Sequence, residues 1–463
     1  MKKNRKKERL IAWLISGTIF LILFSGLVVA GFYGFKYVKT IQEEKVKQQE
    51  IEEAKKAAEE AAKKEAEEAE AKAKEEEAAS EESFDQEALD AIFSDEEEID
   101  EEMADEEEDI ELTQKATEFV EGMTIEQKVA QLFFIKQEAI TDVDVCTAAG
   151  DKTKEALSEY PVGGIIYFAD NIEDPEQLKT MTTKLQGYSK EIMKLPIFIG
   201  IDEEGGSVTR IAKNENFEVS KVDTMEEIGL SGDKDKAYEA GNTIGTYLAE
   251  YGFNVNFAPD ADVITNTNNV IKDRSFGTDP NVVADMVVAY ASGLKDANVL
   301  ACAKHYPGHG AVEADTHEGE AIIDRSWIEL EETELVPFKR AAREKLPFIM
   351  VSHICVPALT VDNIPASLSG LLITDKLRGD IGYKGIIITD SLAMGAIDTI
   401  YSSDEAAVKA LQAGADMLLM PMDFKAAYEG VLNAVSEGTI SEERVNESVI
   451  RIVKEKIKLN GEE

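Results

Sequence analysis

The sequence predicts an α/β fold of the (β/α)8 TIM-barrel type, with one βα unit that is irregular. Seven short apolar runs alternate with helical segments after residue 113, and each run is nearly continuous rather than alternating in polarity. Continuous apolar strands are typical of a parallel sheet covered on both faces. A doubly wound sheet is the alternative, but no run is followed by GxGxxG, so a dinucleotide-binding fold has little support. The runs are Val162–Phe168, Pro196–Asp202, Asn254–Asp262, Val299–Tyr306, Phe348–Ile354, Gly385–Asp390 and Ala415–Pro421.

The composition argues against a nucleic-acid-binding protein, a disulfide-stabilised protein and a zinc finger. The chain has 463 residues, with 49 Lys and Arg against 92 Asp and Glu, which gives a formal net charge of −43. Such an acidic chain is poorly suited to nucleic acid, because phosphate binding needs a basic face. Its 3 cysteines cannot form a disulfide framework or a zinc-finger site.

The first 35 residues predict a membrane anchor. Residues 1–9 form a basic tail, and residues 10–35 carry no charged side chain, which is long enough to span a bilayer as a helix. The positive-inside rule then places the barrel outside the cell, on a single-pass protein of the cell membrane. A cleaved signal peptide is the competing interpretation, because Val28-Val29-Ala30 loosely resembles a cleavage site.

Residues 40–112 predict a stalk. Their first part is rich in Lys, Glu and Ala, with opposite charges four residues apart, which favours a solvated helix. Only Val46 and Ile51 occupy candidate core positions, so a coiled coil has little support. From Glu75 to Gln114 there is no Lys or Arg, and such self-repelling sequence predicts disorder.

The barrel domain is expected over residues 113–463. Thr124 and Gln127 fit a capping box at a helix N-terminus. Val129, Leu132 and Phe133 then predict the apolar face of that helix.

Polar side chains gather at the C-terminal ends of the predicted strands, where barrel active sites lie. Any one of them could serve structure alone, but their joint placement at strand ends indicates a site. They come from at least five strands: Asp202, Arg210, Asp260, Arg274, Lys304, His305, His309, Asp315, His317, His353 and Asp390.

These residue types suit the hydrolysis of a glycosidic bond. Carboxylates and cations can surround a polyhydroxylated ligand with charge-assisted hydrogen bonds. A carboxylate such as Asp202 or Asp390 can attack an anomeric carbon, and a histidine can protonate the leaving oxygen. Asp315 lies two residues from His317 and is placed to orient its imidazole.

Four segments together resemble glycoside hydrolase family 3, specifically its single-domain β-N-acetylglucosaminidases. They read IDEEGGSVTR, DRSFG, KHYPGHG followed by DTH, and IITDSLAM. The resemblance implies Asp390 as nucleophile and His317 as acid/base, assisted by Asp315. It also implies a set of residues that hold the N-acetylglucosamine unit, and no metal or organic cofactor. That set is Asp202, Arg210, Arg274, Lys304 and His305.

The implied activity is the exo-acting, retaining release of terminal N-acetylglucosamine from cell-wall fragments or related oligosaccharides. The sequence departs from the family pattern at Ser207, where arginine is usual, and at Asp260, where an apolar residue is usual. The segment Glu318–Ile322 also lacks the proline commonly found after the histidine.

Other functions stay open at this point. A phosphorolytic variant is one, because a neutral histidine would not repel phosphate. A metal-dependent hydrolase using His305, His309, Asp315 and His317 is another, although no HExxH element supports it. A substrate-assisted hexosaminidase using Asp202 and Glu203 and a non-enzymatic wall-binding protein complete the set.

Overall fold

The computed structural model describes residues 107–460, with the exception of 267–268, 313–320 and 361–362. The predicted basic tail (1–9) and anchor (10–35) lie outside the described residues, as does the stalk (40–112) up to residue 106. The boundaries assigned to these segments therefore stay predictions.

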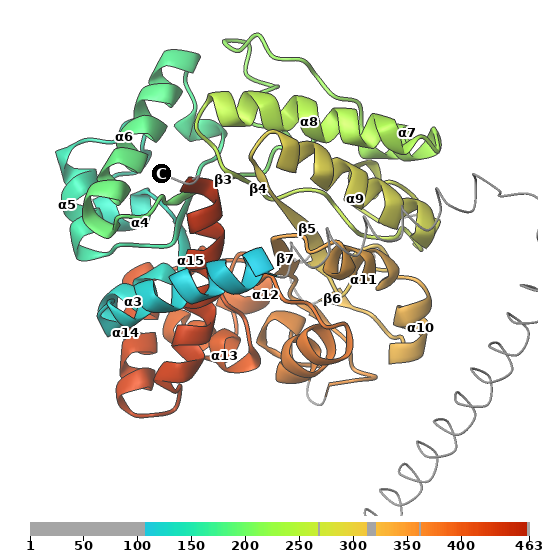
Figure 1. The fold of residues 1–463 in the computed structure, drawn as a ribbon. Helices are drawn as coiled ribbons and strands as arrows, with labels where there is room; N and C mark the ends of the chain where they lie inside the picture. Colours follow the sequence, from blue (N-terminus) through green and yellow to red (C-terminus); the bar gives the residue numbers. More distant parts are fainter. Residues whose placement is uncertain (1–106, 267–268, 313–320, 361–362, 461–463) are drawn as a thin grey trace, which may run out of the picture. The chain divides into compact units, whose positions relative to one another are not determined.

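Eight parallel strands form a nearly closed barrel, in the order β10-β1-β2-β3-β4-β5-β7-β9. Figure 1 shows β3, β4, β5 and β7 in the middle of the domain, with the helices around them. An isolated parallel bridge between Ile388 and Met417 joins β9 to the start of β10, so that the sheet curves back on itself. The strands are β1 (Phe133–Lys136), β2 (Gly164–Ile166), β3 (Phe198–Ile201), β4 (Val255–Asn256), β5 (Leu300–Tyr306), β7 (Phe348–Val351), β9 (Ile386–Thr389) and β10 (Leu418–Leu419). A separate pair, β6 (Ala321–Ile322) and β8 (Ile354–Cys355), lies outside this sheet.

Seven of the eight barrel strands lie within the predicted apolar runs, which confirms them. The eighth is β1, and here the prediction was wrong, because Leu132 and Phe133 were assigned to a helix. The helix α3 (Ile125–Gln131) does begin with the predicted capping box at Thr124, but it ends before Phe133. Phe133 and Phe134 then pair with both β10 and β2, and these pairings on two sides hold the segment extended.

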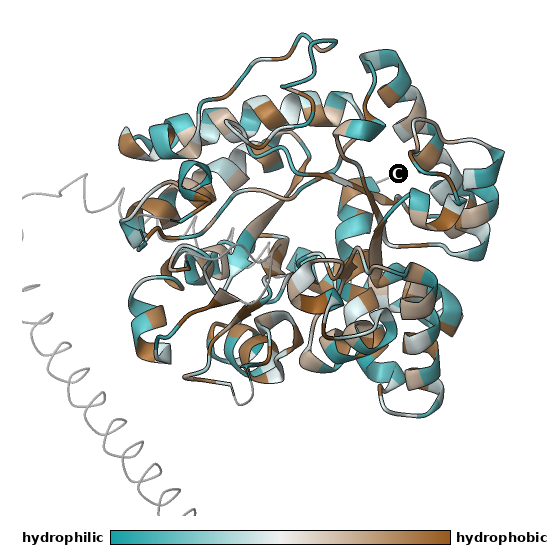
Figure 2. Cartoon of the chain, turned by 180° about the vertical axis from the view of Figure 1, so that it is seen from behind, coloured by the Kyte–Doolittle hydropathy of each residue, from teal (hydrophilic) through white to brown (hydrophobic). Residues whose placement is uncertain are grey.

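Helices surround the barrel and mix hydrophilic with apolar residues, whereas the strands are mostly apolar (Figure 2). Aspartate side chains cap four of these helices, which explains why each begins where it does. The main helices are α5 (Asp151–Glu159), α6 (Pro175–Met193), α7 (Met225–Leu230), α8 (Lys234–Glu250), α9 (Pro280–Asp296), α10 (Trp327–Glu332), α11 (Val336–Arg343), α13 (Ser403–Ala413), α14 (Phe424–Ser436) and α15 (Glu442–Asn460). Short helical segments include α4 (Glu138–Thr141), η2 (Lys272–Arg274), η5 (Leu371–Asp380) and α12 (Gly395–Asp398).

None of the helices within the described ranges could cross a lipid bilayer. This finding contradicts the predicted localisation at the cell membrane, so that localisation and the membrane as a partner are set aside. The two helices of 19 residues, α6 and α15, carry charged side chains along their length, and this makes them surface helices of the barrel.

Residues 107–121 are helical, although residues 107–112 fall within the stretch whose charge predicted disorder. Ala116 and Val120 are buried at the inner face of this segment. Asp109 also forms an ion pair with Lys454 of α15, at 2.5 Å. The apolar packing holds this acidic segment in place, because an exposed ion pair contributes little.

The N-terminal end of the barrel carries a cluster of buried charge, which we call the base cluster: Asp416, Arg378, Arg444, Arg451 and Ser448. Asp416 lies just before β10 and is fully buried, and it accepts hydrogen bonds from Ser448 (2.6 Å), Arg451 (3.1 Å) and Arg378. Arg444 lies 3.9 Å from the same carboxylate. Burial alone would raise the pKa of Asp416, but the three guanidinium groups hold it below its usual range.

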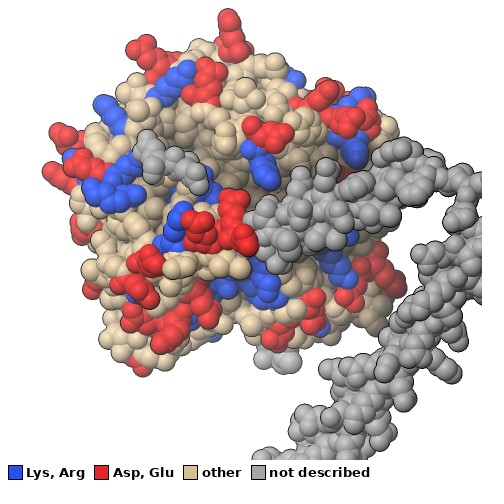
Figure 3. Space-filling view, in the orientation of Figure 1, with Lys and Arg blue, Asp and Glu red and all other residues tan. Residues whose placement is uncertain are grey.

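Near the base cluster, α15 buries a lysine. Lys456 is 1 % exposed; its ammonium donates a hydrogen bond to Gln131 (2.7 Å) and lies 5.0 Å above the ring of Phe198. Burial lowers the pKa of Lys456 to about 7. Acidic and basic side chains are interspersed over the face of the molecule that Figure 3 presents.

Candidate active site

Asp202, Arg210 and Lys304 meet at the C-terminal end of the barrel. Asp202 directly follows β3, and Lys304 lies in β5. The ammonium of Lys304 is 2.9 Å from one carboxylate oxygen of Asp202, and a guanidinium nitrogen of Arg210 is 3.8 Å from the other. Asp202 and Arg210 are partly exposed, so this group faces the mouth of the barrel.

Glu204 ties Arg274 to the same group. The guanidinium of Arg274 donates two hydrogen bonds of 2.8 Å to the Glu204 carboxylate, and Lys304 lies 2.6 Å from it. Burial would raise the pKa of Glu204, but the two cations hold it well below its usual range. Glu204 therefore fixes the directions of two of the predicted sugar-binding cations.

The neighbouring Glu203 has a different task. Its buried carboxylate accepts hydrogen bonds from the backbone N–H groups of Ile211 (3.0 Å), Ala212 (2.9 Å) and Arg210, and from the hydroxyl of Tyr247 (3.0 Å). These bonds fold the loop after β3 so that Arg210 returns to Asp202. With its oxygens engaged in this way, Glu203 does not fit the substrate-assisted role that the Asp202–Glu203 pair was given as an alternative.

Asp262 holds the loop that carries both His305 and His309. Its carboxylate accepts from the backbone N–H groups of both histidines and lies 2.7 Å from Nδ1 of His305. We assign the Nδ1 proton of His305 as donated to Asp262, which leaves Nε2 to face Arg274 at 3.5 Å. Burial lowers the pKa of His305 to about 4, so this imidazole is neutral at physiological pH.

Asp390 directly follows β9 and is partly exposed at the mouth of the barrel. One of its carboxylate oxygens accepts from the N–H of Ser391 at 2.7 Å, and its own N–H donates to Val351. Burial would raise the pKa of Asp390, but the neighbouring His353, the N–H of Ser391 and the ammonium of Lys304 together hold it below its usual value. Asp390 is therefore ionised at neutral pH, as attack on an anomeric carbon requires.

His353 holds the backbone at this strand end in place. It is fully buried, with Nε2 2.8 Å from the carbonyl oxygen of Ser391 and Nδ1 2.7 Å from the hydroxyl of Ser367. The ring therefore donates from Nε2 to the carbonyl, and it fixes the backbone next to Asp390.

Asp315 and His317 lie outside the described residues, and their predicted roles stay predictions. The other six predicted site residues, Asp202, Arg210, Arg274, Lys304, His305 and Asp390, come together at one end of the barrel.

Three buried side chains have the spacing of a metal site in the described part of the chain. Ligand atoms of Asp260, Asp262 and His305 lie within 4.8 Å of one another. However, the guanidinium of Arg274 is 3.6 Å from Asp260 and 3.5 Å from His305. A cation already stands against these ligand atoms, so the three residues do not fit a divalent metal ion.

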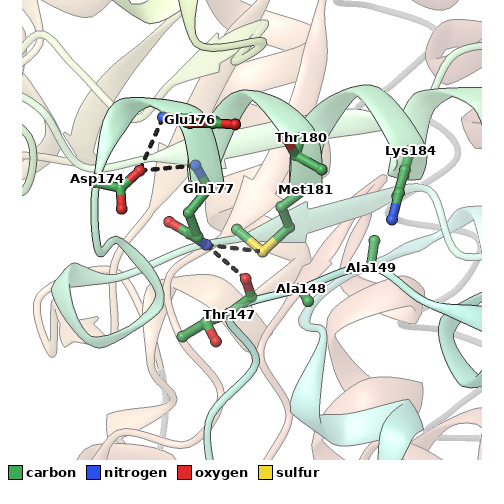
Figure 4. Close-up of a pocket in the computed structure, with 9 residues that line it drawn as sticks. All are labelled: Thr147, Ala148, Ala149, Asp174, Glu176, Gln177, Thr180, Met181 and Lys184. Atoms are coloured by element: carbon green, nitrogen blue, oxygen red, sulfur yellow. Dashed lines mark hydrogen bonds between the residues drawn. The ribbon is translucent and has the colours of Figure 1, made fainter.

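A hollow of about 340 Å³ lies elsewhere, between the loop 147–149 and the first turns of α6 (Figure 4). Its polar groups serve the fold, since Asp174 caps α6 and Gln177 donates to the carbonyl of Thr147 at 2.7 Å. It contains no residue of the candidate site.

Sequence reasoning missed the structural roles of Glu203, Glu204 and Asp262. A signal was present, because Glu203 and Glu204 directly follow Asp202, and Asp262 closes the third predicted strand. Their partners, however, lie on other strands or across a loop.

Comparisons with known proteins agree with this geometry. Residues 124–454 match the model of the glycosyl hydrolase family 3 N-terminal domain. A β-hexosaminidase A from Pseudoalteromonas piscicida is 33 % identical over 338 residues, covering 68 % of this chain and 56 % of the relative. A β-hexosaminidase from Nitrosomonas eutropha is 35 % identical over 289 residues, covering 61 % of this chain and 80 % of the relative.

Solved structures are also similar. The structure of a glycoside hydrolase family 3 β-N-acetylglucosaminidase from Paenibacillus sp. str. FPU-7 matches with a TM-score of 0.69 and 36 % identity, covering 74 % of this chain and 64 % of that one. A family 3 glycosyl hydrolase from Mycobacterium smegmatis matches with a TM-score of 0.64 and 31 % identity, covering 73 % of this chain and 98 % of that one. The chain thus spans little more than half the length of the Pseudoalteromonas relative. Because the family model covers most of its length, the chain belongs to glycosyl hydrolase family 3 through the N-terminal domain of that family.

Proposed function

We propose that this protein is an exo-acting, retaining β-N-acetylglucosaminidase. One observation carries the proposal: an ionised Asp390 lies at the same barrel mouth as the paired group of Asp202, Arg210 and Lys304. A pyranose bound by that group through its hydroxyls would present its anomeric carbon to Asp390. The hexosaminidase relatives support N-acetylglucosamine as the sugar.

The proposed reaction has two displacements. In the first, a carboxylate oxygen of Asp390 bonds to the anomeric carbon as the glycosidic bond breaks, and His317 gives its proton to the leaving oxygen. In the second, His317 takes a proton from water, whose oxygen replaces Asp390 on the same carbon. Two inversions retain the anomeric configuration, and both residues return to their starting states.

The sugar-binding residues share the remaining work. Lys304, Arg274 and Arg210 would donate to hydroxyl or acetamido oxygens, and Asp202 would accept from hydroxyls. His305 is neutral and adds no repulsion to the partial positive charge that develops on the sugar ring. Asp315 would orient the imidazole of His317 and stabilise its charged form.

The natural substrates we propose are cell-wall fragments and related oligosaccharides with a terminal, non-reducing N-acetylglucosamine. Incubating the purified protein with such fragments, with chitin oligosaccharides and with an aryl β-N-acetylglucosaminide tests this. Release of N-acetylglucosamine, seen first as the β-anomer by NMR, is expected. Release of the sugar as a 1-phosphate in phosphate buffer would show that the enzyme is a phosphorylase and not a hydrolase. If none of the three substrates is turned over, the proposal is refuted.

The proposed acid/base residue has its own test. Replacing His317 by alanine should slow substrates with poor, alkoxide-like leaving groups far more than aryl glycosides, because a good leaving group departs without a proton. The expected difference between the two losses is about 10²-fold or more. Equal, modest losses on both substrates would remove His317 from the mechanism. Asp315→Ala should give the same pattern, and the two losses should not add in the double variant.

A further inference from the structure

A second carboxyl group lies beside His305, at a position where the family resemblance leads one to expect an apolar residue. Asp260 and Asp262 follow β4 and are both 0 % exposed. A parallel bridge joins the backbone of Asp260 to that of Lys304, which places Asp260 next to β5.

The two carboxyl groups are bonded very differently. Asp262 accepts from His305 and His309, as described above. Asp260 accepts the N–H of Asp262 on Oδ1, at 3.1 Å. Its Oδ2 is buried with no hydrogen-bond partner in the described part of the chain, at 3.6 Å from Arg274 and 3.9 Å from Nδ1 of His305.

The charges around Asp260 do not balance if it is ionised. Three buried carboxyl groups share two cations here: Arg274 interacts with Glu204, Asp260 and Asp262, and Lys304 with Glu204. Lys304 also serves Asp202, whose other partner is Arg210. A third buried negative charge would therefore lack a partner, and an unmatched buried charge is strongly destabilising.

One proton restores the balance, and the geometry limits where it can be. His305 already donates from Nδ1 to Asp262, and its Nε2 faces the guanidinium of Arg274 at 3.5 Å, so a second proton there would oppose a positive charge. Asp390, whose pKa is held below its usual value, is ionised and does not take it. Asp260 is the buried carboxyl group here with an oxygen that accepts no hydrogen bond from the described residues, so its negative charge is compensated least and the proton belongs to it.

We propose that Asp260 is a positioning residue that works as a neutral carboxylic acid beside Asp262. In this state it keeps His305 neutral and leaves Arg274 paired with Glu204, directed at the sugar. The proposal deepens the proposed function and rests on it. It is supported by the pKa of Asp260, which burial and the neighbouring Asp262 carboxylate raise well above the usual range.

Loss of this proton has a defined consequence. An ionised Asp260 would attract Arg274, 3.6 Å away, in competition with Glu204. Sugar binding would weaken, so KM would rise on the alkaline side of the pH profile while kcat changed less.

Replacing Asp260 by asparagine tests this directly, because asparagine has nearly the same shape, can accept the same N–H and is neutral at every pH. The pH dependence of kcat/KM is measured on an aryl β-N-acetylglucosaminide. We expect Asp260→Asn to stay within about threefold of the wild type at acidic pH. On the alkaline side it should retain kcat/KM where the wild type loses about tenfold through KM. Asp260→Val should lose activity that Asp260→Asn retains, because valine offers Asp262 no hydrogen bond.

A second measurement does not depend on catalysis. A carboxyl group whose pKa is raised by folding binds its proton more tightly in the folded state, so stability falls as pH rises from about 4 through the folded pKa. Asp260→Asn should remove that fall in the thermal unfolding midpoint. The matched control is Asp375→Asn, an exposed aspartate of η5, which should change neither profile.

Three results would overturn the proposal. A large loss of activity in Asp260→Asn at every pH would mean that the ionised form is the working one. Alkaline profiles of activity and stability identical to those of the wild type would mean that Asp260 does not titrate there. A rise in the unfolding midpoint with Zn²⁺ that Asp260→Asn abolishes would make the site a metal centre. A wild type inactive on N-acetylglucosaminides would refute the proposed function, while the unfolding measurement would still decide the state of Asp260.

Discussion

The two ends of the barrel both bury charged side chains, and they treat them in opposite ways. In the base cluster, one carboxylate faces three arginines, and both of its oxygens accept hydrogen bonds. At the mouth, the carboxyl groups outnumber the cations, and an oxygen of Asp260 has no hydrogen-bond partner in the described residues. All carboxylate oxygens of the base cluster accept hydrogen bonds, whereas the mouth contains a carboxyl oxygen that accepts none from the described residues.

This difference separates stability from function. Because the carboxylate of the base cluster already has its hydrogen bonds, a ligand could add none, and we expect its residues to matter for folding alone. Partly exposed groups such as Asp202, Arg210 and Asp390 can exchange water for sugar hydroxyls. Replacing a partly exposed carboxylate of the mouth by its amide should therefore stop catalysis, whereas the same change in the base cluster should weaken folding.

Asp390→Asn is expected to have the largest effect. It removes the attacking charge with little change in shape, so turnover should fall by about 10³-fold or more while the unfolding midpoint stays close to that of the wild type. A 2-fluoro sugar with a good leaving group should label Asp390, which mass spectrometry of the digested protein can locate. Labelling of another residue, or an inverted product, would contradict the assignment.

Asp416→Asn is the counterpart at the base. It leaves three guanidinium groups without their carboxylate, and removing one partner of a buried ionic group costs about 3–5 kcal/mol of unfolding free energy. Denaturant unfolding measures this loss, and Asp398→Asn, an exposed aspartate of α12, serves as the control. The folded fraction should keep the wild-type KM. If Asp416→Asn changes KM and leaves the unfolding free energy unchanged, the base cluster serves function and the contrast between the two ends is wrong.

Lys456→Met is expected to act least, and in the stabilising direction. Because the pKa of Lys456 is lowered to about 7 by burial, the unfolded state holds its proton more tightly, so the stability of the wild type rises between about pH 7 and its unfolded pKa near 10.4. The substitution should remove this rise and stabilise the protein by about 1–3 kcal/mol below pH 7. Unfolding midpoints at pH 6 and pH 9 measure the effect. A midpoint lowered at both values would show that the hydrogen bond to Gln131 outweighs the buried charge.

The fold was predictable where local pattern and tertiary packing agree. Continuous apolar runs between helical segments located seven strands, because a strand buried on both faces needs apolar residues throughout. The segment at Phe133 follows a capped helix without a break in polarity, and its parallel partners on both sides are far away in the sequence. That is why the local pattern favoured the wrong structure there.

The sequence predicted the residues at the barrel mouth but not the residues that orient them. Of the proposed sugar-binding residues, Asp202, Lys304 and His305 lie at the ends of strands, where position alone marks them. The groups that set their directions and charge states, Glu203, Glu204 and Asp262, act through contacts that no local pattern encodes. Glu204, for example, meets Arg274 across seventy positions of the chain. Such pairings follow from barrel closure.

The base cluster also has a consequence for the order in which the protein is made. Arg444, Ser448 and Arg451, which surround Asp416, belong to α15, and α15 also packs against α3 at the start of the barrel. While a ribosome has released the chain only as far as β10, Asp416 has one of its three arginines, Arg378, and the barrel end lies uncovered. Closure of this end therefore waits until α15, residues 442–460, has left the exit tunnel. Stalled chains that end near residue 440 should be open to proteases and chaperones, and chains released past α15 should not.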